Sequence, residues 1–148
     1  MQDIRSTRTT APLEAIAAWH ILVTHGSRFT RFGVVGILGI GVNTALLYVL
    51  SQVVGLDHLL AAALATEVTI LFNFALNDRW TFRDAPATLS WIRRAARYNA
   101  IALAGLGISL AVFAVLMGEL GLYYLGANLV AVGAATVWNY TINARFTW

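Results

Sequence analysis

The chain contains no cysteine and no lysine. Without cysteine, disulfides, thiolate metal sites and cysteine nucleophiles are all excluded. Charged residues are scarce, at 11% of 148 residues, whereas hydrophobic residues make up 59%. So few polar side chains cannot cover the surface of a water-soluble globule of this size. The composition therefore predicts a membrane protein.

Four segments are apolar over the roughly 20 residues that a helix needs to cross a bilayer. They are residues 32–54, 59–77, 98–118 and 122–144. Glu67 is the only charged side chain that lies within any of them. We therefore expect an all-α membrane protein with four transmembrane helices.

The sequence of residues 31–82 recurs, without a gap, as residues 97–148. The match is closest at the end of each copy, where both read Asn-x3-Asn-x-Arg-aromatic-Thr-aromatic. Because each copy holds two predicted spans, the chain is predicted to be two tandem helical hairpins. With an even number of spans per copy, the hairpins run parallel and are related by a pseudo-twofold axis along the membrane normal.

Two segments lie outside the repeats. Residues 1–30 precede the first copy, and within them residues 13–25 have the pattern of a short amphipathic helix on the membrane surface. A disordered tail explains the same residues equally well. Residues 83–96 join the copies, and the apolar residues between their arginines predict a second interfacial helix that leads into the third span.

All ten basic residues are arginines, and they fall on one side of the predicted membrane. They are Arg5, Arg8, Arg28 and Arg31 before the first span, Arg79, Arg83, Arg93, Arg94 and Arg97 between the second and third, and Arg145 after the fourth. By the positive-inside rule, both termini and the central loop are predicted to be cytoplasmic. We expect a multi-pass integral protein of the inner (cytoplasmic) membrane.

Asparagines and arginines of the repeated pattern form the candidate binding site. Amide side chains are costly to expose to lipid, so they should face protein, water or a ligand headgroup. Arginine presents a planar fork of donors that matches phosphate oxygens. The candidate residues for binding a lipid phosphate and its sugar are Arg31, Asn73, Asn77, Arg79, Arg97, Asn139, Asn143 and Arg145. In the structural alternative, the asparagines form hydrogen bonds between helices. The arginines then set the orientation of the chain in the membrane or bind bulk anionic lipid.

Glu67 breaks the repeat, because Gly133 occupies the equivalent position. A carboxylate near the middle of a bilayer needs either a partner or a proton. A proton-coupling role and a neutral, hydrogen-bonded structural role are both open for this residue. The candidate partners on other helices are Asn43, Tyr48, Gln52, Ser109 and Asn128.

Several classes of function are disfavoured. The three histidines are scattered and no serine or aspartate is placed to work with them, so we expect no enzyme, no cofactor and no metal site. Without a soluble domain to present a basic face, nucleic acid binding is not expected either. A small residue follows Gly41 and Gly107 at helical spacing, as Ala45 and Ala111, which allows close helix contacts and favours a homo-oligomer.

The opening Arg31-Phe32-Gly33-Val34-Val35-Gly36 and the stretch Asn73-Phe74-x-Leu76-Asn77-x-Arg79-Trp80-Thr81-Phe82 resemble the GtrA-like family of small four-helix membrane proteins. That family also supplies the transmembrane region of some polyprenyl-phosphate mannose synthases. The resemblance covers about residues 31–148 and implies a role in cell-surface polysaccharide synthesis. Its usual form would be a flippase that moves a polyprenyl-phosphate-linked sugar across the membrane.

The resemblance leaves two alternatives open. The chain could be a non-transporting anchor that brings a membrane glycosyltransferase to its lipid substrate, in which case only cytoplasmic residues should matter. A proton-coupled efflux protein for small molecules would explain Glu67, although the basic rim argues against cationic cargo. The implied partners are a polyprenyl-phosphate-linked sugar, membrane lipids and a glycosyltransferase.

Overall fold

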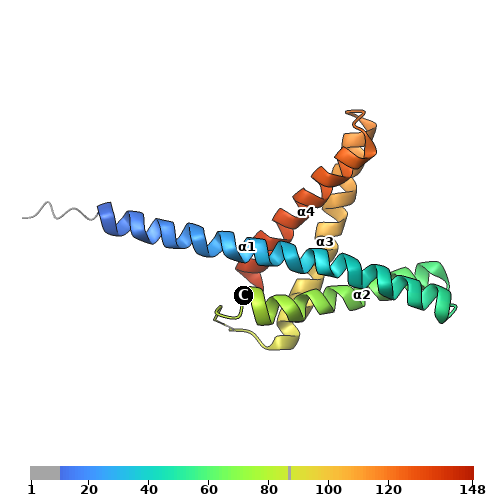
Figure 1. Cartoon of the computed structure of the whole chain (residues 1–148), viewed down its shortest axis with the longest axis horizontal. Helices are drawn as coiled ribbons and strands as arrows, with labels where there is room; N and C mark the ends of the chain where they lie inside the picture. Colours follow the sequence, from blue (N-terminus) through green and yellow to red (C-terminus); the bar gives the residue numbers. More distant parts are fainter. Residues whose placement is uncertain (1–10, 87) are drawn as a thin grey trace, which may run out of the picture.

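The computed structural model describes the backbone of residues 11–86 and 88–148, and the side chains from residue 26 onward except that of residue 87. These residues form helices and connecting turns, with no strand among them, which confirms the predicted all-α membrane class (Figure 1). The elements in order are α1 (Ala11–Tyr48), the π-helical turn η1 (Val49–Val53), α2 (His58–Leu76), the π-helical turn η2 (Asn77–Thr81), α3 (Trp91–Gly118) and α4 (Tyr124–Phe146).

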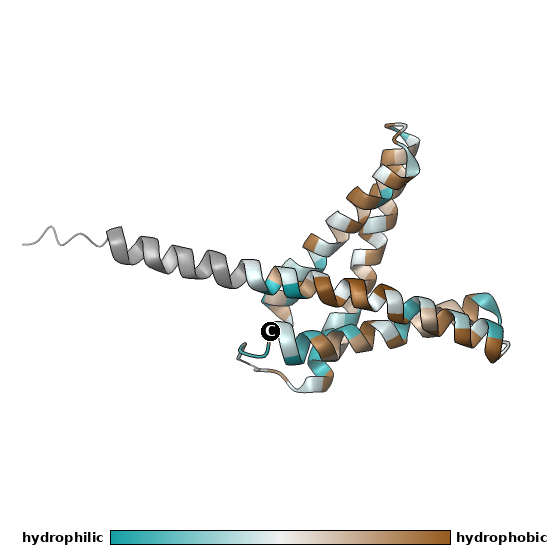
Figure 2. Cartoon of the chain, in the orientation of Figure 1, coloured by the Kyte–Doolittle hydropathy of each residue, from teal (hydrophilic) through white to brown (hydrophobic). Residues whose placement is uncertain are grey.

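Three of the helices are long and apolar enough to cross a membrane, namely those covering Gly26–Val53, His58–Thr81 and Trp91–Gly118. α4 has 23 residues, enough to span about 30 Å at 1.5 Å per residue, but asparagine and threonine recur along it and make it less apolar. It lies alongside α3 and completes the second hairpin (Figure 1). Hydrophobic residues recur along the coloured part of each of the helices in Figure 2.

The first helix is longer than the sequence suggested. α1 has 38 residues and runs without a break from Ala11 into the first span, where a separate surface helix or a tail was expected. At 1.5 Å per residue it is about 57 Å long, whereas a hydrocarbon core is about 30 Å thick. Part of α1 must therefore lie outside the core. The predicted surface helix of residues 83–96 also differs, because residues 91–96 form the first turns of α3.

Both hairpins turn in the same way. Gly55 and Gly121 occupy equivalent positions, and their φ angles of 79° and 60° lie in the left-handed region that favours glycine. In each turn a leucine N–H closes the preceding helix by donating to a carbonyl six residues back, from Leu56 to Leu50 and from Leu122 to Leu116, both at 3.0 Å. This is a wide variant of the Schellman cap, one residue longer than the usual form, and the repeated Gly-Leu pair marks where each hairpin reverses direction.

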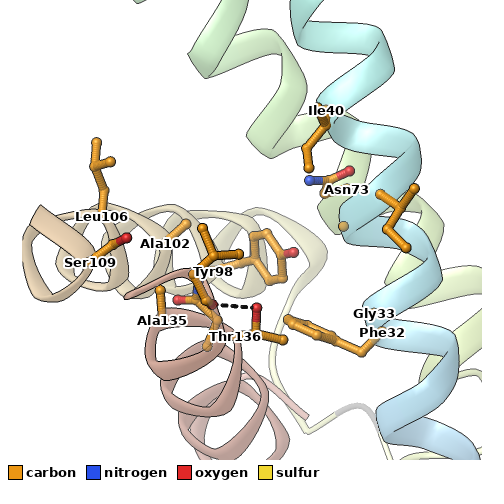
Figure 3. Close-up of a pocket in the computed structure, with 14 residues that line it drawn as sticks. Phe32, Gly33, Ile40, Asn73, Tyr98, Ala102, Leu106, Ser109, Ala135 and Thr136 are labelled. Atoms are coloured by element: carbon orange, nitrogen blue, oxygen red, sulfur yellow. Dashed lines mark hydrogen bonds between the residues drawn. The ribbon is translucent and has the colours of Figure 1, made fainter. Parts of the chain in front are cut away.

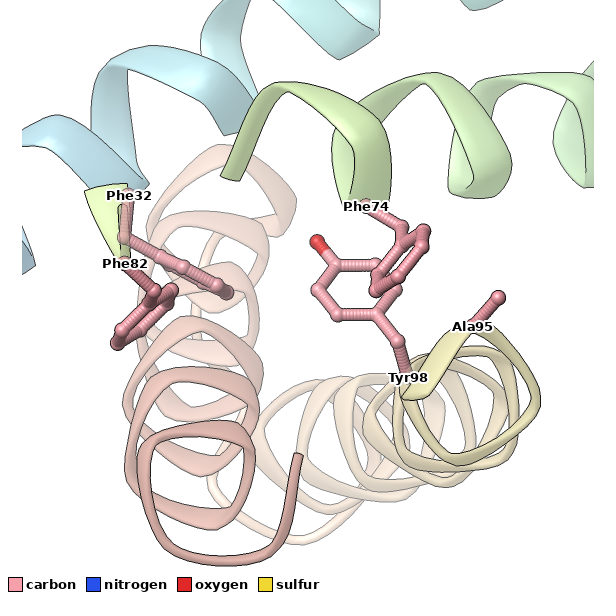
Figure 4. Close-up of a cluster of buried hydrophobic side chains, with 5 residues drawn as sticks. All are labelled: Phe32, Phe74, Phe82, Ala95 and Tyr98. Atoms are coloured by element: carbon pink, nitrogen blue, oxygen red, sulfur yellow. The ribbon is translucent and has the colours of Figure 1, made fainter. Parts of the chain in front are cut away.

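The two hairpins, α1–α2 and α3–α4, meet at one end and diverge towards their turns (Figure 1). At the shared end lies a cluster of buried side chains, with Phe32 beside Phe82 and Phe74 beside Tyr98 (Figure 4). We call this the arginine end, because four arginines from four different elements lie at it: Arg31 of α1, Arg79 of η2, Arg97 of α3 and Arg145 of α4. The contacts there occur in equivalent pairs: Phe32–Tyr140 with ring centroids 5.7 Å apart, and Phe74–Tyr98 at 5.6 Å.

Candidate functional site

A cavity of about 420 Å³ lies between the two hairpins. Its walls come from α1, α3 and α4, and α2 contributes only Asn73. In Figure 3, Asn73 and Ile40 lie on one side of this space and Ser109, Ala135 and Thr136 on the other. The lining is mostly apolar with a few amide and hydroxyl groups, which is the composition typical of a pocket that binds an organic ligand.

Each hairpin holds one asparagine over a glycine of its neighbouring helix. A Cβ atom added at Gly39 would lie 2.5 Å from Asn73 Nδ2, and one added at Gly105 would lie 2.5 Å from Asn139 Oδ1. Gly39 and Gly105 are equivalent positions, as are Asn73 and Asn139. Each glycine leaves room for the amide, and a side chain at that position would displace it.

These two asparagines are partly buried and incompletely bonded. The Oδ1 atoms of Asn73 and Asn139 are shielded from solvent and accept no hydrogen bond from any described residue. An amide can turn about its last bond, so either its oxygen or its NH2 group can point into the cavity. Thr136 is different, because its hydroxyl donates to the Val132 carbonyl at 2.8 Å (Figure 3). The two amides are therefore the polar groups of the cavity best able to bind a ligand.

Asn77 and Asn143, the second asparagine of each repeat, have a different environment. Both are buried, and each Oδ1 accepts a 2.7 Å hydrogen bond from a threonine four residues later, Thr81 and Thr147 respectively. Their amide groups are also engaged, that of Asn77 by the Tyr98 hydroxyl at 3.1 Å and that of Asn143 by the Asn139 carbonyl at 2.8 Å.

These bonds hold the end of each hairpin in shape. The backbone carbonyl of each asparagine also accepts a bond from an N–H five residues later, from Phe82 at 2.8 Å and from Trp148 at 3.2 Å. The resulting wide turn directs an aromatic side chain inward in both copies. We interpret Asn77 and Asn143 as structural, and their predicted contact with a headgroup stays a prediction that requires these bonds to open.

The four arginines of the arginine end fall into two pairs. Arg31 Nη1 donates to the Trp80 carbonyl at 3.4 Å and, at the equivalent position, Arg97 Nη1 donates to the Phe146 carbonyl at 2.7 Å. One donor of each fork thus ties the first helix of a hairpin to the end of the second. Arg79 and Arg145 are exposed, and no described residue pairs with them. Their charge is available to an anion at any relevant pH.

A second charged group at this end was not predicted from the sequence. Asp78 and Arg94 form a largely buried ion pair between η2 and α3, and Trp148 Nε1 donates to Asp78 Oδ1 at 2.9 Å. The sequence does hold a signal for this pair, because Asp78 is acidic where its equivalent is Ala144. An acid that interrupts a basic rim in one copy alone suggests a specific partner.

Glu67 is not among the residues that line the cavity. It borders a groove of about 400 Å³ between α2 and α3, and its Oε1 accepts a hydrogen bond from Asn99 Nδ2. None of the partners considered from the sequence bonds to it in the described structure. Asn43 has a buried Oδ1 without a described partner, and Asn128 is exposed. A proton-coupling role for Glu67 stays a prediction.

Two comparisons place the chain among known proteins. The family model described as the GtrA/DPMS transmembrane domain matches residues 31–148. The chain belongs to this family. A dolichol-phosphate mannosyltransferase from Pyrococcus furiosus is 36% identical over 121 residues, which cover 82% of this chain and 34% of the relative. The GtrA/DPMS chain thus spans about a third of that relative's length, and the resemblance expected from the sequence is confirmed.

Proposed function

We propose that this GtrA/DPMS protein binds a polyprenyl-phosphate-linked sugar in the membrane and carries its headgroup from one leaflet to the other. The observation that carries the proposal is the pair of Asn73 and Asn139, each held over a glycine beside the cavity between the hairpins. Their unpaired oxygens lie within spans where an unsatisfied polar atom is costly. A sugar offers hydroxyl groups that can satisfy such amides.

The arginine end supplies the complementary charge. Exposed Arg79 and Arg145 can bind phosphate oxygens through bidentate hydrogen bonds. Neutral amides are suited to the next part of the path, because they bind hydroxyl groups without placing a charge in a low-dielectric region. We propose that the phosphate is recognised at the arginine end, which faces the cytoplasm, and that the sugar passes between the two asparagines.

The relative supports this class of ligand. By name it is a dolichol-phosphate mannosyltransferase, an enzyme that transfers a mannosyl group to a polyprenyl-type phosphate. The match takes in 34% of its length, and the residues of the present chain from 31 to 148 match the family model of a transmembrane domain. We propose that the present chain handles the lipid-linked sugar and catalyses no glycosyl transfer itself.

Transport can be measured with purified protein. In liposomes, a short-chain polyprenyl-phosphate sugar should equilibrate between leaflets faster with the protein than without it. The double variant Asn73→Leu/Asn139→Leu should lose most of this acceleration, whereas Thr141→Val, on the exposed outer face of α4, should retain it. Equal exchange in wild-type and protein-free liposomes would refute transport, and full activity in the double variant would remove the amides from the path.

Anchoring of a glycosyltransferase is the second candidate, and one observation favours it. The matched region is a minor part of a longer protein whose name includes a transferase activity. An anchor would capture a membrane glycosyltransferase from the same cells through the arginine end, and reconstituted protein would move no lipid. The asparagine variants would then have no effect on capture, because the amides lie inside the cavity.

A further inference from the structure

The duplicated fold has two seams at which one hairpin faces the other. We call them the α2–α3 seam, which includes η2, and the α1–α4 seam. Shifting the sequence by one repeat converts one seam into the other, so residues at the two seams can be compared position by position. Ile37 of α1 is equivalent to Leu103 of α3, and Val132 of α4 is equivalent to Thr66 of α2.

Three polar contacts connect the hairpins across the α2–α3 seam. Asn99 donates to Glu67, Asn77 donates to the Tyr98 hydroxyl at 3.1 Å, and Arg94 forms an ion pair with Asp78. They are distributed along α2 and η2, from the middle of the span to the arginine end. Within a membrane, polar contacts of this kind hold helices together, whereas apolar contacts between helices exchange with lipid tails at little cost.

None of the three contacts can form at the equivalent positions of the α1–α4 seam. In each equivalent pair at least one residue lacks a polar side chain: the pairs are Gly133 and Gly33, Asn143 and Phe32, and Ala144 and Arg28. Rings pack at this seam near the arginine end, where Tyr140 contacts Phe29 with centroids 5.1 Å apart. The two seams are therefore unequal, and the difference is greatest at the depth of Glu67, where the opposite seam has two glycines.

The cavity lies on the α1–α4 side. Five of its lining residues belong to α1, four to α3 and four to α4, whereas α2 contributes Asn73 alone, so the α2–α3 seam supplies the smaller part of the wall. The side chains at its outer edge are apolar and exposed: Ile37 by 70%, Ile40 by 65% and Val132 by 46%. These side chains meet hydrocarbon in a membrane, so an apolar chain can extend past them from the cavity into the bilayer at this seam.

We propose that the isoprenoid chain of the lipid-linked ligand lies in the α1–α4 seam while its headgroup occupies the cavity, and that the α2–α3 seam stays closed to it. The occupant is a prenyl chain because the amides within and the arginines at the end suit the polar head of the same molecule. This inference rests on the proposed function, and it adds the side from which the lipid enters.

The absence of native cysteine allows one reporter to be placed at a time. Ile37→Cys and its equivalent Leu103→Cys, which is 51% exposed in the α2–α3 groove, are labelled in detergent with benzophenone maleimide and returned to liposomes. Irradiation with radiolabelled polyprenyl phosphate should give several-fold more lipid adduct at position 37 than at position 103. Unlabelled polyprenyl phosphate should suppress the adduct at position 37, whereas phosphatidic acid should not.

A second matched pair is the control for a label that disturbs folding at the first pair of positions. Val132→Cys reports the same seam from α4, and its equivalent Thr66→Cys reports the groove of the α2–α3 seam from α2. The same preference for position 132 over position 66 is expected. Equal, competable adducts at both members of each pair, or a preference for positions 103 and 66, would overturn the inference.

Direct binding separates this inference from the proposed function. Binding of the radiolabelled polyprenyl phosphate to the unmodified protein is measured in parallel. If it binds but gives no competable adduct at positions 37 and 132, the isoprenoid chain does not lie in the α1–α4 seam. The proposed function is not contradicted by that result. If it does not bind at all, the proposed function fails, and the inference fails with it.

Discussion

Phe82 and Trp148 occupy equivalent positions at the ends of the two repeats, and they stack directly on each other, with ring centroids 4.2 Å apart and planes inclined by 12°. The pseudo-twofold relation between the hairpins therefore brings two copies of the same position face to face. Each ring also contacts the other repeat, since Phe82 lies beside Tyr140 and Trp148 beside Phe74. The repeated aromatic-Thr-aromatic ending thus joins the hairpins.

The first prediction concerns this stack. Trp148→Ala removes a ring from the junction and should reduce the free energy of unfolding by about 3 kcal/mol, the low end for a large aromatic because Trp148 is only partly buried. Trp148→Phe keeps a stacking ring and loses only the bond to Asp78, a loss of about 1–2 kcal/mol. Denaturant unfolding in mixed micelles measures both. Phe146→Ala, at an exposed aromatic, is the control, and equal losses at Trp148→Ala and Trp148→Phe would show that the stack contributes nothing.

The second prediction tests the glycine beneath each amide. Gly39→Ala should displace Asn73 and weaken binding of a polyprenyl-phosphate sugar, and Gly105→Ala should act likewise on Asn139. Gly41→Ala is the matched control on the same helix, because a Cβ there meets no atom within 4 Å. Adding Asn73→Ala to Gly39→Ala should weaken binding little further, since the two changes act through one group. Additive losses would contradict this coupling.

The third prediction separates arginine geometry from charge. Arg79→Lys and Arg145→Lys keep the charge but lose the planar fork, so affinity for a polyprenyl phosphate should fall about tenfold, the loss expected for one charge-assisted hydrogen bond. Arg83→Lys is the control, because Arg83 is exposed and pairs with neighbouring Asp84 at 3.3 Å. Lipid binding to purified protein measures the effect. Unchanged affinity in both variants would leave these arginines with a topological role alone.

The fourth prediction concerns Asp78 and Arg94, whose side chains are only 16% and 10% exposed. Arg94→Met leaves a buried carboxylate without its partner and should destabilise the protein by about 3–5 kcal/mol. Asp78→Leu/Arg94→Met removes both charges and should recover most of that loss, because apolar replacement of a whole buried pair is often neutral. A double variant no more stable than Arg94→Met would mean that the carboxylate gains little from the ion pair.

The fifth prediction fixes the orientation in the membrane. If the arginine end is cytoplasmic, reporter domains fused after Phe82 or Trp148 should be active as cytoplasmic fusions. Tags inserted at Asp57 or Glu119, in the hairpin turns, should be reachable from outside intact cells. Digestion of a reporter joined to Trp148 by protease added to intact cells would contradict this orientation.

Much of the fold follows from sequence because its signals are local. Apolar length located the four helices and therefore the two turns between them, where the structure places Gly55 and Gly121 in the left-handed region. The repeat also singled out Asn73 and Asn139. Contacts between the repeats were harder to predict, because they depend on how the hairpins cross. Asn99 was therefore missed as the partner of Glu67.

Local spacing also selected the wrong glycines for contact within the chain. The small residues after Gly41 and Gly107 suggested that these positions meet another helix, yet a Cβ at either would meet no atom within 4 Å. The glycines that do approach a neighbouring helix are Gly39 and Gly105. Spacing along one helix shows which face carries small side chains. The position of the neighbouring helix decides which face makes the contact. A role for Gly41 and Gly107 between copies of the chain stays a prediction.

The Glu67–Asn99 contact shows what a fused duplication permits. In a symmetric dimer of identical hairpins, both seams would carry the same residues, so a carboxylate that closed one seam would also close the other. Joining the hairpins in one chain removes that constraint, and here Gly133 and Gly33 stand where a dimer would repeat the carboxylate and the amide. A protein built from two similar halves can thus have two chemically different sides within the plane of the membrane.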